Sequence, residues 1–392
     1  MSDRLRTWAE VNLDSLGFNY YNIRKHVGSG TKIMSVIKSN GYGHGCLEIA
    51  RKLLQCGTDC FAVACGDEAL VLRNNGITIP ILILGYTPYD MIDELLNADI
   101  TFTVFDIEFA KELSKRASCL NKIAKIHIKL DVGMGRIGFL YGYNEVDDKK
   151  TIIDIKEISK LKMLELEGIF THFPCADEEK TELTYNQFSV FMKAISELEN
   201  NGIVFKLKHC CNSAALIRFP EMHLDMVRPG IILYGCYPSE FCDNDTISLT
   251  PVMELKTKIT HLKNLEKGHR ISYGGIYETS GCCKIATLGI GYADGFSRKL
   301  SNCYEVLVND TKVKIIGRIC MDQCMIDVTN VNNIAVGQIV TVFGKDLSVD
   351  ICSQLNGTIN YETLCSIGMR VPRIYIDDNK VKYTVNYLSD KL

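Results

Sequence analysis

The sequence predicts an α/β protein in which a (β/α)₈ TIM-type barrel precedes a mostly β C-terminal domain. Short apolar runs rich in β-branched residues recur from residue 33 to residue 228, and amphipathic helical patterns such as 46–54 and 106–113 separate them. Eight alternations favour a closed barrel over an open doubly wound sheet. Near Thr250 the pattern changes to β-rich segments with turns between them. The eight runs are 33–38, 61–64, 81–85, 101–105, 126–131, 166–172, 205–210 and 225–228.

The remaining segments complete this division of the chain. At 392 residues the chain exceeds one ordinary core, so we expect more than one domain. Residues 1–12 read as an N-terminal strand that joins the β domain, residues 13–245 as the barrel, and residues 246–392 as the β domain. Asp14 is expected to cap a helix over 15–26. The expected β segments of the second domain are 255–262, 283–290, 305–316 and 338–343.

Composition excludes several function classes. A net charge of -3 with scattered basic residues argues against a nucleic-acid partner, and no apolar stretch reaches the roughly 18 residues of a membrane span. A cytoplasmic location is therefore expected. The 17 cysteines are odd in number and lie largely in apolar runs, so they read as reduced core residues. No opposed Cys-x-x-Cys pairs occur, and we expect no metal site.

Lys38 stands where an apolar run ends and a glycine-rich loop begins. Gly41, Gly43 and Gly45 follow it within the segment 36–45 and allow a tight bend. Burial at a strand end lowers the pKa of a lysine, which suits a nucleophile, a link to an aldehyde or a proton acceptor. The alternative is a structural lysine that extends its charge into solvent.

Two loops at the predicted barrel mouth are suited to an anion. Asn212 and Ser213 follow the seventh run and open a short helix, and Gly230 follows the eighth run, where a backbone can approach a ligand closely. Barrel enzymes commonly hold phosphate after strands seven and eight. Asn-Ser and Pro-Gly are also ordinary turn sequences, so neither loop alone decides a function.

Charged side chains follow other runs of the barrel. Arg228, His172 and Arg136 come at the ends of the eighth, sixth and fifth runs, where barrel enzymes place catalytic groups. A lone histidine after an apolar strand is more often structural. Lys38, the phosphate loops and an arginine together suggest pyridoxal 5′-phosphate as the cofactor.

Several motifs, in the same order, resemble the alanine racemase family of fold-type III pyridoxal-phosphate enzymes. The likeness covers nearly the whole chain. The motifs are Lys38-Ser39-Asn40-Gly41-Tyr42-Gly43-His44-Gly45, Lys129-Leu130-Asp131-Val132-Gly133-Met134-Gly135-Arg136, Thr171-His172-Phe173, Asn212-Ser213, Val227-Arg228-Pro229-Gly230, Ile271-Ser272-Tyr273-Gly274, Gly291-Tyr292-Ala293-Asp294-Gly295 and Met321-Asp322-Gln323.

The resemblance implies roles in cofactor binding. Lys38 would hold the cofactor covalently, and Arg228 would face the pyridine nitrogen. Because a guanidinium does not give up its proton, the ring nitrogen would stay unprotonated, which weakens electron withdrawal and favours return of the proton to Cα. The other implied cofactor residues are Tyr42, His172, Asn212, Ser213, Gly230 and Ile231.

The resemblance also implies two-base racemisation of a small amino acid, L- and D-alanine. Lys38 would serve one face of Cα and Tyr273, from the β domain of a partner chain, the other, so a homodimer with shared active sites is implied. His172 and Arg228 would support Tyr273. The product D-alanine would enter peptidoglycan precursors. Without the family, Tyr273 would read as a tyrosine in a glycine turn.

Further residues carry over by position. Arg136 and Met321 would bind the substrate, Lys129 would be carbamylated and pair with Arg136, and Tyr292 would line the entrance. Met369 stands where the family usually has tyrosine, which would widen the pocket and makes serine, or a broader range of amino acids, an alternative substrate.

Two further readings compete with a racemase. Barrel-plus-β amino-acid decarboxylases share the lysine, but their glycine-rich phosphate motif and late cysteine motif are absent from this sequence. A non-enzymatic pyridoxal-phosphate-binding protein would lack the domain that carries Tyr273.

Overall fold

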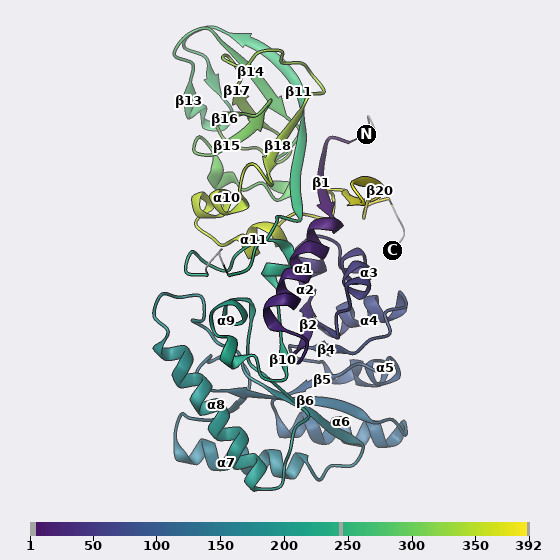
Figure 1. The fold of residues 1–392 in the computed structure, drawn as a ribbon. Coiled ribbons are helices and arrows are strands. Elements are labelled where there is room, and N and C mark those ends of the chain that lie inside the picture. The colour runs from purple at the N-terminus through teal and green to yellow at the C-terminus, as the bar shows by residue number, and fades with distance from the viewer. Residues whose placement is uncertain (1–4, 243–245, 390–392) are drawn as a thin grey trace. The chain divides into compact units, whose positions relative to one another are not determined.

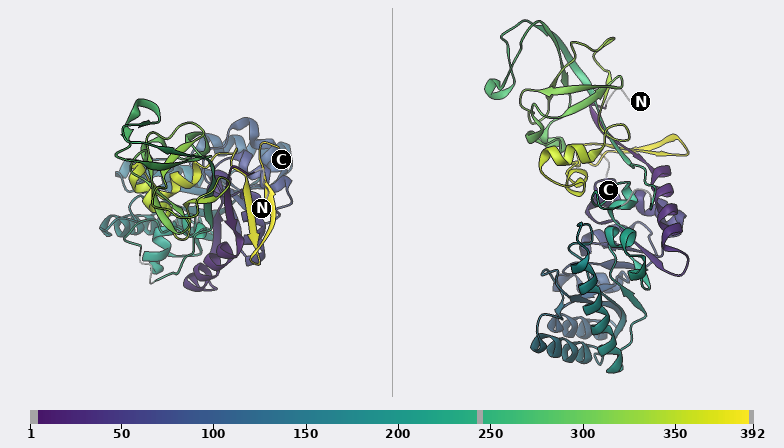
Figure 2. Two further views of the ribbon diagram at one scale, coloured as in Figure 1. Left: turned by 90° about the horizontal axis from the view of Figure 1, so that it is seen from above. Right: turned by 60° about the vertical axis from the view of Figure 1, so that its left-hand side comes forward.

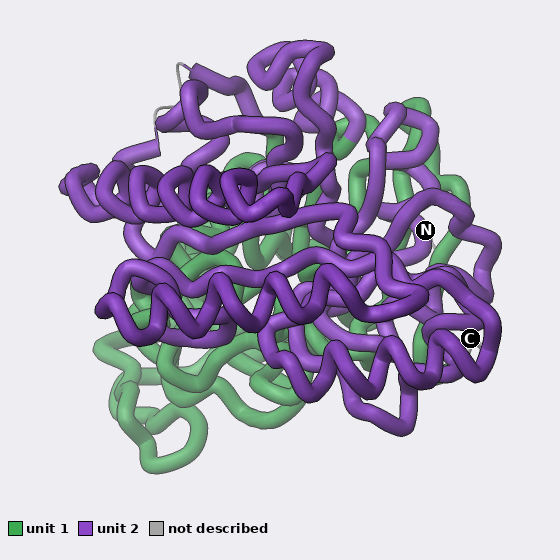
Figure 3. Tube along the Cα trace, turned by 90° about the horizontal axis from the view of Figure 1, so that it is seen from below, with its two compact units in different colours: residues 1–16, 42–45, 250–392 green, residues 17–41, 46–249 purple. Residues whose placement is uncertain are grey.

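The computed structural model describes residues 5–242 and 246–389 and divides the chain into two compact units (Figure 3). Unit 1 comprises residues 1–16, 42–45 and 250–392, and unit 2 comprises residues 17–41 and 46–249. The lysine-bearing segment 36–45 is therefore shared between the two units.

Unit 2 is a parallel barrel, as predicted. One sheet has the order β10-β2-β3-β4 and the other β5-β6-β8-β9, with β7 (Phe139–Leu140) beside β6. A bridge between Leu82 and Thr101 connects β4 to β5, and the Asp225 amide donates to Lys208 O (3.2 Å) between β9 and β10. The strands are β2 (Lys32–Val36), β3 (Cys60–Val63), β4 (Ile81–Ile83), β5 (Phe102–Val104), β6 (Ala124–Asp131), β8 (Leu164–Phe170), β9 (Leu207–His209) and β10 (Met226–Val227).

Amphipathic helices alternate with these strands (Figures 1 and 2). In α3, Ile49, Ala50 and Leu53 form the buried face, and the Asp106 side chain accepts from the Phe109 amide at the start of α6. Burial of apolar faces on both sides of the strands explains their continuous hydrophobic runs. The helices are α1 (Leu13–Val27), α2 (Lys38–Tyr42), α3 (Cys46–Cys56), α4 (Gly66–Asn74), α5 (Ile92–Asn97), α6 (Ile107–Cys119), α7 (Glu145–Ile158), α8 (Glu182–Asn200) and α9 (Ser213–Arg218).

Unit 1 is mostly β, as predicted. Its large sheet has the order β14-β17-β16-β15-β18-β11-β1-β19-β20, and β14 also pairs with β11, so the first six strands close on themselves. β1 (Thr7–Asn12) pairs antiparallel with β11 and parallel with β19. The other strands are β11 (Met253–Leu265), β12 (Arg270–Ile271), β13 (Tyr277–Glu278), β14 (Cys283–Leu288), β15 (Glu305–Val308), β16 (Thr311–Ile316), β17 (Cys324–Asp327), β18 (Ile339–Phe343), β19 (Arg373–Asp377) and β20 (Lys380–Val385).

Two details of unit 1 differ from the sequence-based expectation. Helices α10 (Val349–Asn356) and α11 (Asn360–Cys365) were not anticipated, because both are too short to repeat a helical period clearly. Asp14 is not the cap of α1. Asn12 Oδ1 accepts from the Ser15 amide (2.9 Å), while the Asp14 carboxylate accepts from two amides of the β19–β20 turn.

All seventeen cysteines lie within the described residues and are free thiols. Across residues 5–242 and 246–389, no helix combines the length and the apolar character needed to cross a membrane.

Candidate active site

Lys38 is half-buried and begins a left-handed turn at the end of β2. Ser39 (φ 54°, ψ 51°), Asn40 (φ 51°, ψ 47°) and Gly41 (φ 61°, ψ 45°) all adopt left-handed backbone angles, and the Gly41 amide donates to Ile37 O (2.9 Å). For non-glycine residues this conformation costs roughly 1–2 kcal/mol each. Tertiary contacts must therefore hold the turn that carries Lys38.

The carboxylate of Glu68, in the first turn of α4, provides such contacts. Its Oε1 accepts from the Ser39 amide (2.5 Å) and its Oε2 from the Ala64 amide (2.7 Å), so it connects the loops after β2 and β3. Asn40 Oδ1 accepts from the Cys46 amide (2.9 Å). The sequence analysis did not identify Glu68, because its partners are backbone amides and that of Ser39 lies 29 positions away.

Residues 42–45 are held by the β domain. Arg373 donates to Gly43 O from Nε (3.0 Å) and Nη2 (2.8 Å), and the Tyr375 hydroxyl donates to His44 O (2.9 Å). Gly45 has φ +101°, and a Cβ there would lie 1.8 Å from the Tyr375 hydroxyl. The glycine is thus required by a close approach as well as by the turn. The Tyr42 side chain is buried and lies 6.1 Å from the ring of Tyr361.

Lys129, His172 and Arg228 come from the carboxyl ends of β6, β8 and β10. The Phe170 ring centroid lies 4.5 Å from Lys129 Nζ and 5.4 Å from Arg228 Cζ. Burial, followed by the positive charges of Arg228 and Arg136, holds the pKa of Lys129 well below its usual value. Burial, with the charges of Lys129 and Arg228, likewise lowers the pKa of His172. Both shifts favour the neutral form of the side chain.

Arg228 is buried and hydrogen-bonded to acceptors only. Its Nη1 donates to His209 Nδ1 (2.8 Å), and its Nη2 donates to Thr171 O (2.8 Å) and Cys210 O (3.0 Å). Within 5–242 and 246–389, no carboxylate forms an ion pair with it. Burial lowers the pKa of Arg228 to about 10, which leaves the guanidinium protonated at neutral pH.

The loops after β9 and β10 meet at Ser213 and Gly230. The Gly230 amide donates to Ser213 Oγ (2.9 Å), and Ile231 follows at the start of a 3₁₀ turn, Ile231–Tyr234. Asn212 caps α9, because its Oδ1 accepts from the Ala215 amide (3.0 Å). The structure therefore brings together hydroxyl and amide groups that the sequence analysis had assigned to a phosphate.

The loop that carries Arg136 is organised by Asp131. The Asp131 carboxylate accepts from the amides of Gly133, Met134, Gly135 and Arg136 at 2.8–3.1 Å. Burial raises its pKa, but the amide hydrogen bonds outweigh burial and the net pKa is lowered. The carboxylate is committed to the loop, while the Arg136 side chain is exposed.

Tyr273 lies in unit 1 on a short turn, Tyr273–Gly275, between β12 and β13. Its side chain is 70% exposed. The preceding Ser272 has φ 64°, and its hydroxyl donates to Arg318 O (2.6 Å), which fixes the turn. Lys38 and Tyr273, the two predicted proton carriers, thus lie in different units of the chain.

Three further predicted residues, Tyr292, Met321 and Met369, are exposed on loops of unit 1. The Ala293 amide donates to Met321 O (3.0 Å), and the Gly368 amide donates to Asp294 O (3.3 Å), so the loops contact one another. The structure therefore gathers these three positions on connected loops.

Ion pairs support the same loops. Asp294 is fully buried and pairs with Arg6 (2.6 Å) and with Arg370 Nε (2.8 Å), and Arg370 also pairs with Asp322 (2.6 Å). The sequence analysis did not assign a role to Arg6 or Arg370. Their partners are separated from them by dozens to hundreds of positions, which no local pattern reveals.

The sequence analysis also missed His127, although a signal was present. Along β6, His127, Lys129 and Asp131 alternate with fully buried Ile128 and Leu130. Because successive strand residues point to opposite faces, the polar residues share one face. A polar face on a buried strand indicates an interior site.

Comparisons with known proteins agree with this geometry. The family profile of the alanine racemase N-terminal domain matches residues 11–238, and that of the alanine racemase C-terminal domain matches residues 252–375. An alanine racemase of Methanococcus maripaludis is 48% identical over 373 residues, which cover 94% of this chain and 98% of that protein. The chain belongs to the alanine racemase family.

Solved members of the family share the fold. The alanine racemase of Clostridium difficile 630 has a TM-score of 0.94 at 43% identity and covers 99% of this chain and 100% of its own. The alanine racemase of Bacillus anthracis, solved with bound L-Ala-P, has a TM-score of 0.91 at 39% identity, with 100% of both chains covered. Family membership thus extends over both domains of the chain.

Proposed function

We propose that this protein interconverts L- and D-alanine with pyridoxal 5′-phosphate as cofactor. The observation that carries the proposal is the barrel mouth of this member of the alanine racemase family. Lys38 follows β2 there, and Arg228 and the Ser213–Gly230 pair follow the closing strands β9 and β10. The relatives named above are alanine racemases, and they favour alanine over the serine alternative.

The donor set fits the cofactor. Ser213 Oγ and the Gly230 amide converge, and no ion pair compensates Arg228 within the described residues, so the mouth offers hydrogen-bond donors and positive charge to an anion. The residues that would hold the cofactor are Lys38, Tyr42, His172, Asn212, Ser213, Arg228, Gly230 and Ile231. When bound, the cofactor withdraws electrons from Cα of the amino acid and so acidifies its proton.

The side chains of this chain would then move that proton. Lys38 and Tyr273 would each take or return a proton at Cα from opposite faces. Arg228 would donate a hydrogen bond to the ring nitrogen without transferring its proton. Arg136 would bind the substrate through its carboxylate, Met321 would also contact the substrate, and Tyr292 would line the entrance.

We further propose a homodimer with shared active sites. Tyr273 is 70% exposed and lies in the unit that does not contain Lys38, which suits a residue that completes the site of another chain. An assay of mixed variants, described below, tests this arrangement directly.

Lys129 is the expected site of carbamylation. Its amine is buried and its pKa is lowered, which favours the neutral form that attacks carbon dioxide, with formation of a C–N bond and loss of one proton to solvent. The carbamate would place a negative charge beside Arg136.

We expect one ¹³C carbamate signal per chain when the protein is equilibrated with ¹³C-bicarbonate at pH 8. The Lys125→Ala control should keep the signal and Lys129→Ala should lose it; a wild-type protein without the signal would contradict the assignment.

Met369 offers a test of substrate range. Its side chain is 55% exposed and lacks the hydroxyl of tyrosine. We expect Met369→Tyr to reduce kcat/KM for L-serine about tenfold more than for L-alanine, because pocket contacts of this size discriminate by about 10–200-fold. Both substrates are measured on the same preparation, so alanine is the internal control. An equal change for both substrates would show that Met369 does not set the pocket size.

A further inference from the structure

A chain of hydrogen-bonded side chains runs through the barrel from Arg228 to Glu167. Arg228 Nη1 lies 2.8 Å from His209 Nδ1, and His209 Nε2 lies 2.8 Å from His127 Nδ1. His127 Nε2 in turn lies 3.3 Å from Glu167 Oε2. The four residues belong to neighbouring strands β6, β8 and β9 and to the end of β10, and both histidines are buried.

The two ends of this network together determine where each proton lies, because Arg228 can only donate and the Glu167 carboxylate can only accept. A guanidinium has donors only, so His209 must accept at Nδ1 and carry its proton on Nε2. That proton is donated to His127 Nδ1, which must therefore carry its own proton on Nε2. The last proton points at the Glu167 carboxylate, which has acceptors only. Both imidazoles are thus neutral and confined to one tautomer.

Packing holds the two imidazole rings in the positions that make these hydrogen bonds. Gly168 lies opposite His127 on the adjacent strand, and a Cβ at that position would come within 2.5 Å of His127 Nδ1. The Phe170 ring stacks on His209, with centroids 4.8 Å apart and planes 5° apart. Burial, followed by the charges of Arg228 and neighbouring groups, holds the pKa of His209 well below its ordinary value, in agreement with a neutral ring.

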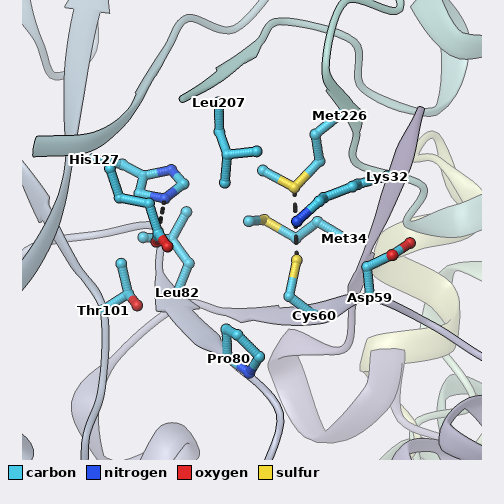
Figure 4. Close-up of a pocket in the computed structure, with 11 residues that line it drawn as sticks. Lys32, Met34, Asp59, Cys60, Pro80, Leu82, Thr101, His127, Leu207 and Met226 are labelled. Carbon is cyan, nitrogen blue, oxygen red and sulfur yellow. Dashed lines mark hydrogen bonds and ion pairs between the residues drawn. The ribbon is translucent and has the colours of Figure 1, made fainter. Parts of the chain in front are cut away.

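Glu167, the last residue of the hydrogen-bonded network, borders a cavity at the amino ends of the barrel strands. The cavity has a volume of about 60 Å³, and His127, Leu207 and Met226 line it (Figure 4). The Glu167 side chain is 22% exposed, so its charge keeps part of its hydration. The hydrogen bond from His127 lowers the pKa of Glu167, which keeps it ionised at neutral pH. The buried cation is therefore connected to a carboxylate in a more polar region.

We propose that Glu167 and His127 are positioning residues for the reaction: by fixing the tautomer of His209 they keep its lone pair on Arg228 and so hold the guanidinium in place. The proposal rests on the proposed function only in giving Arg228 a role opposite the cofactor ring. If the tautomers were free to change, His209 would present a proton to Arg228. The two donors would then repel each other, and the guanidinium would lose one of its three acceptors.

The test compares Glu167→Gln with Glu165→Gln. A glutamine at 167 offers both a donor and an acceptor to His127, so it no longer selects one tautomer. Glu165 lies on the same strand two residues earlier and pairs with the surface Lys206 (2.6 Å). The control therefore makes the same chemical change outside the hydrogen-bonded network from Arg228 to Glu167. ¹⁵N NMR of protein labelled at the histidine nitrogens reports each tautomer, with signals assigned from His127→Asn and His209→Asn.

In the wild-type holoenzyme and in Glu165→Gln, both rings should show a proton on Nε2 only. In Glu167→Gln we expect mixed tautomers at His127 and His209, with kcat reduced about tenfold in both directions and KM changed less than about twofold, as for other orienting partners of a functional group. Unchanged tautomers in Glu167→Gln, or changed tautomers with unchanged kcat, would overturn the proposal. Absence of racemisation in the wild type would refute the proposed function alone, because the NMR result does not depend on activity.

Discussion

Replacing Lys38 with alanine should abolish racemisation of alanine, with a loss of at least about 10⁴-fold, because one side chain both anchors the cofactor and carries a proton at Cα. The variant should also fail to exchange the Cα proton of either enantiomer with deuterated water. Racemisation is followed by the change in optical rotation and exchange by proton NMR.

The control for this variant is Lys25→Ala, an exposed lysine in the last turn of α1, which should retain wild-type activity. Thermal unfolding of both variants checks that each is folded. A folded Lys38→Ala protein that retains more than about 1% of the wild-type rate would contradict the prediction. Lys38 would then be neither the cofactor anchor nor a required proton carrier.

Replacing Tyr273 with phenylalanine should slow racemisation about 10²–10⁴-fold, the usual contribution of one positioned acid–base group. The loss must be equal in the two directions, because a catalyst cannot shift the equilibrium between enantiomers. Exchange of the Cα proton with solvent distinguishes the residue that acts on one face of Cα from the residue that acts on the other. With Lys38 intact, one enantiomer should still exchange its proton with deuterated water, while the other should not.

Tyr277→Phe is the matched control. This tyrosine lies four residues further on, in β13, and its replacement also removes one tyrosine hydroxyl. It should leave both racemisation and exchange unchanged. If Tyr273→Phe exchanges both enantiomers at the wild-type rate, a different residue serves the second face.

Mixing the two inactive variants decides whether one site uses two chains. A dimer of one Lys38→Ala chain and one Tyr273→Phe chain contains one site with both residues intact and one with neither. Subunit exchange at equal amounts should therefore recover up to about a quarter of the wild-type activity. No recovery, with subunit exchange shown independently by mass spectrometry, would place both residues of each site on one chain.

The sequence by itself determined the fold class, because the evidence for it is local. Buried parallel strands are continuous apolar runs and the helices between them have an apolar face, so each element is visible within a window of a few residues. The motifs that identify the family are also contiguous. Lys38, the Asn212-Ser213 pair and Arg228 could therefore be found at the ends of their strands.

Only the tertiary structure decided how these groups are held. Glu68 reaches the turn of Lys38 from another loop, Arg373 binds Gly43 O from 330 positions away, and His127 meets His209 across adjacent strands. Asp14 shows the same limit, since its expected amide partners were local and its real ones belong to a turn near residue 378. Such contacts join residues that are distant in sequence, and their proton positions follow from distances that no linear pattern contains.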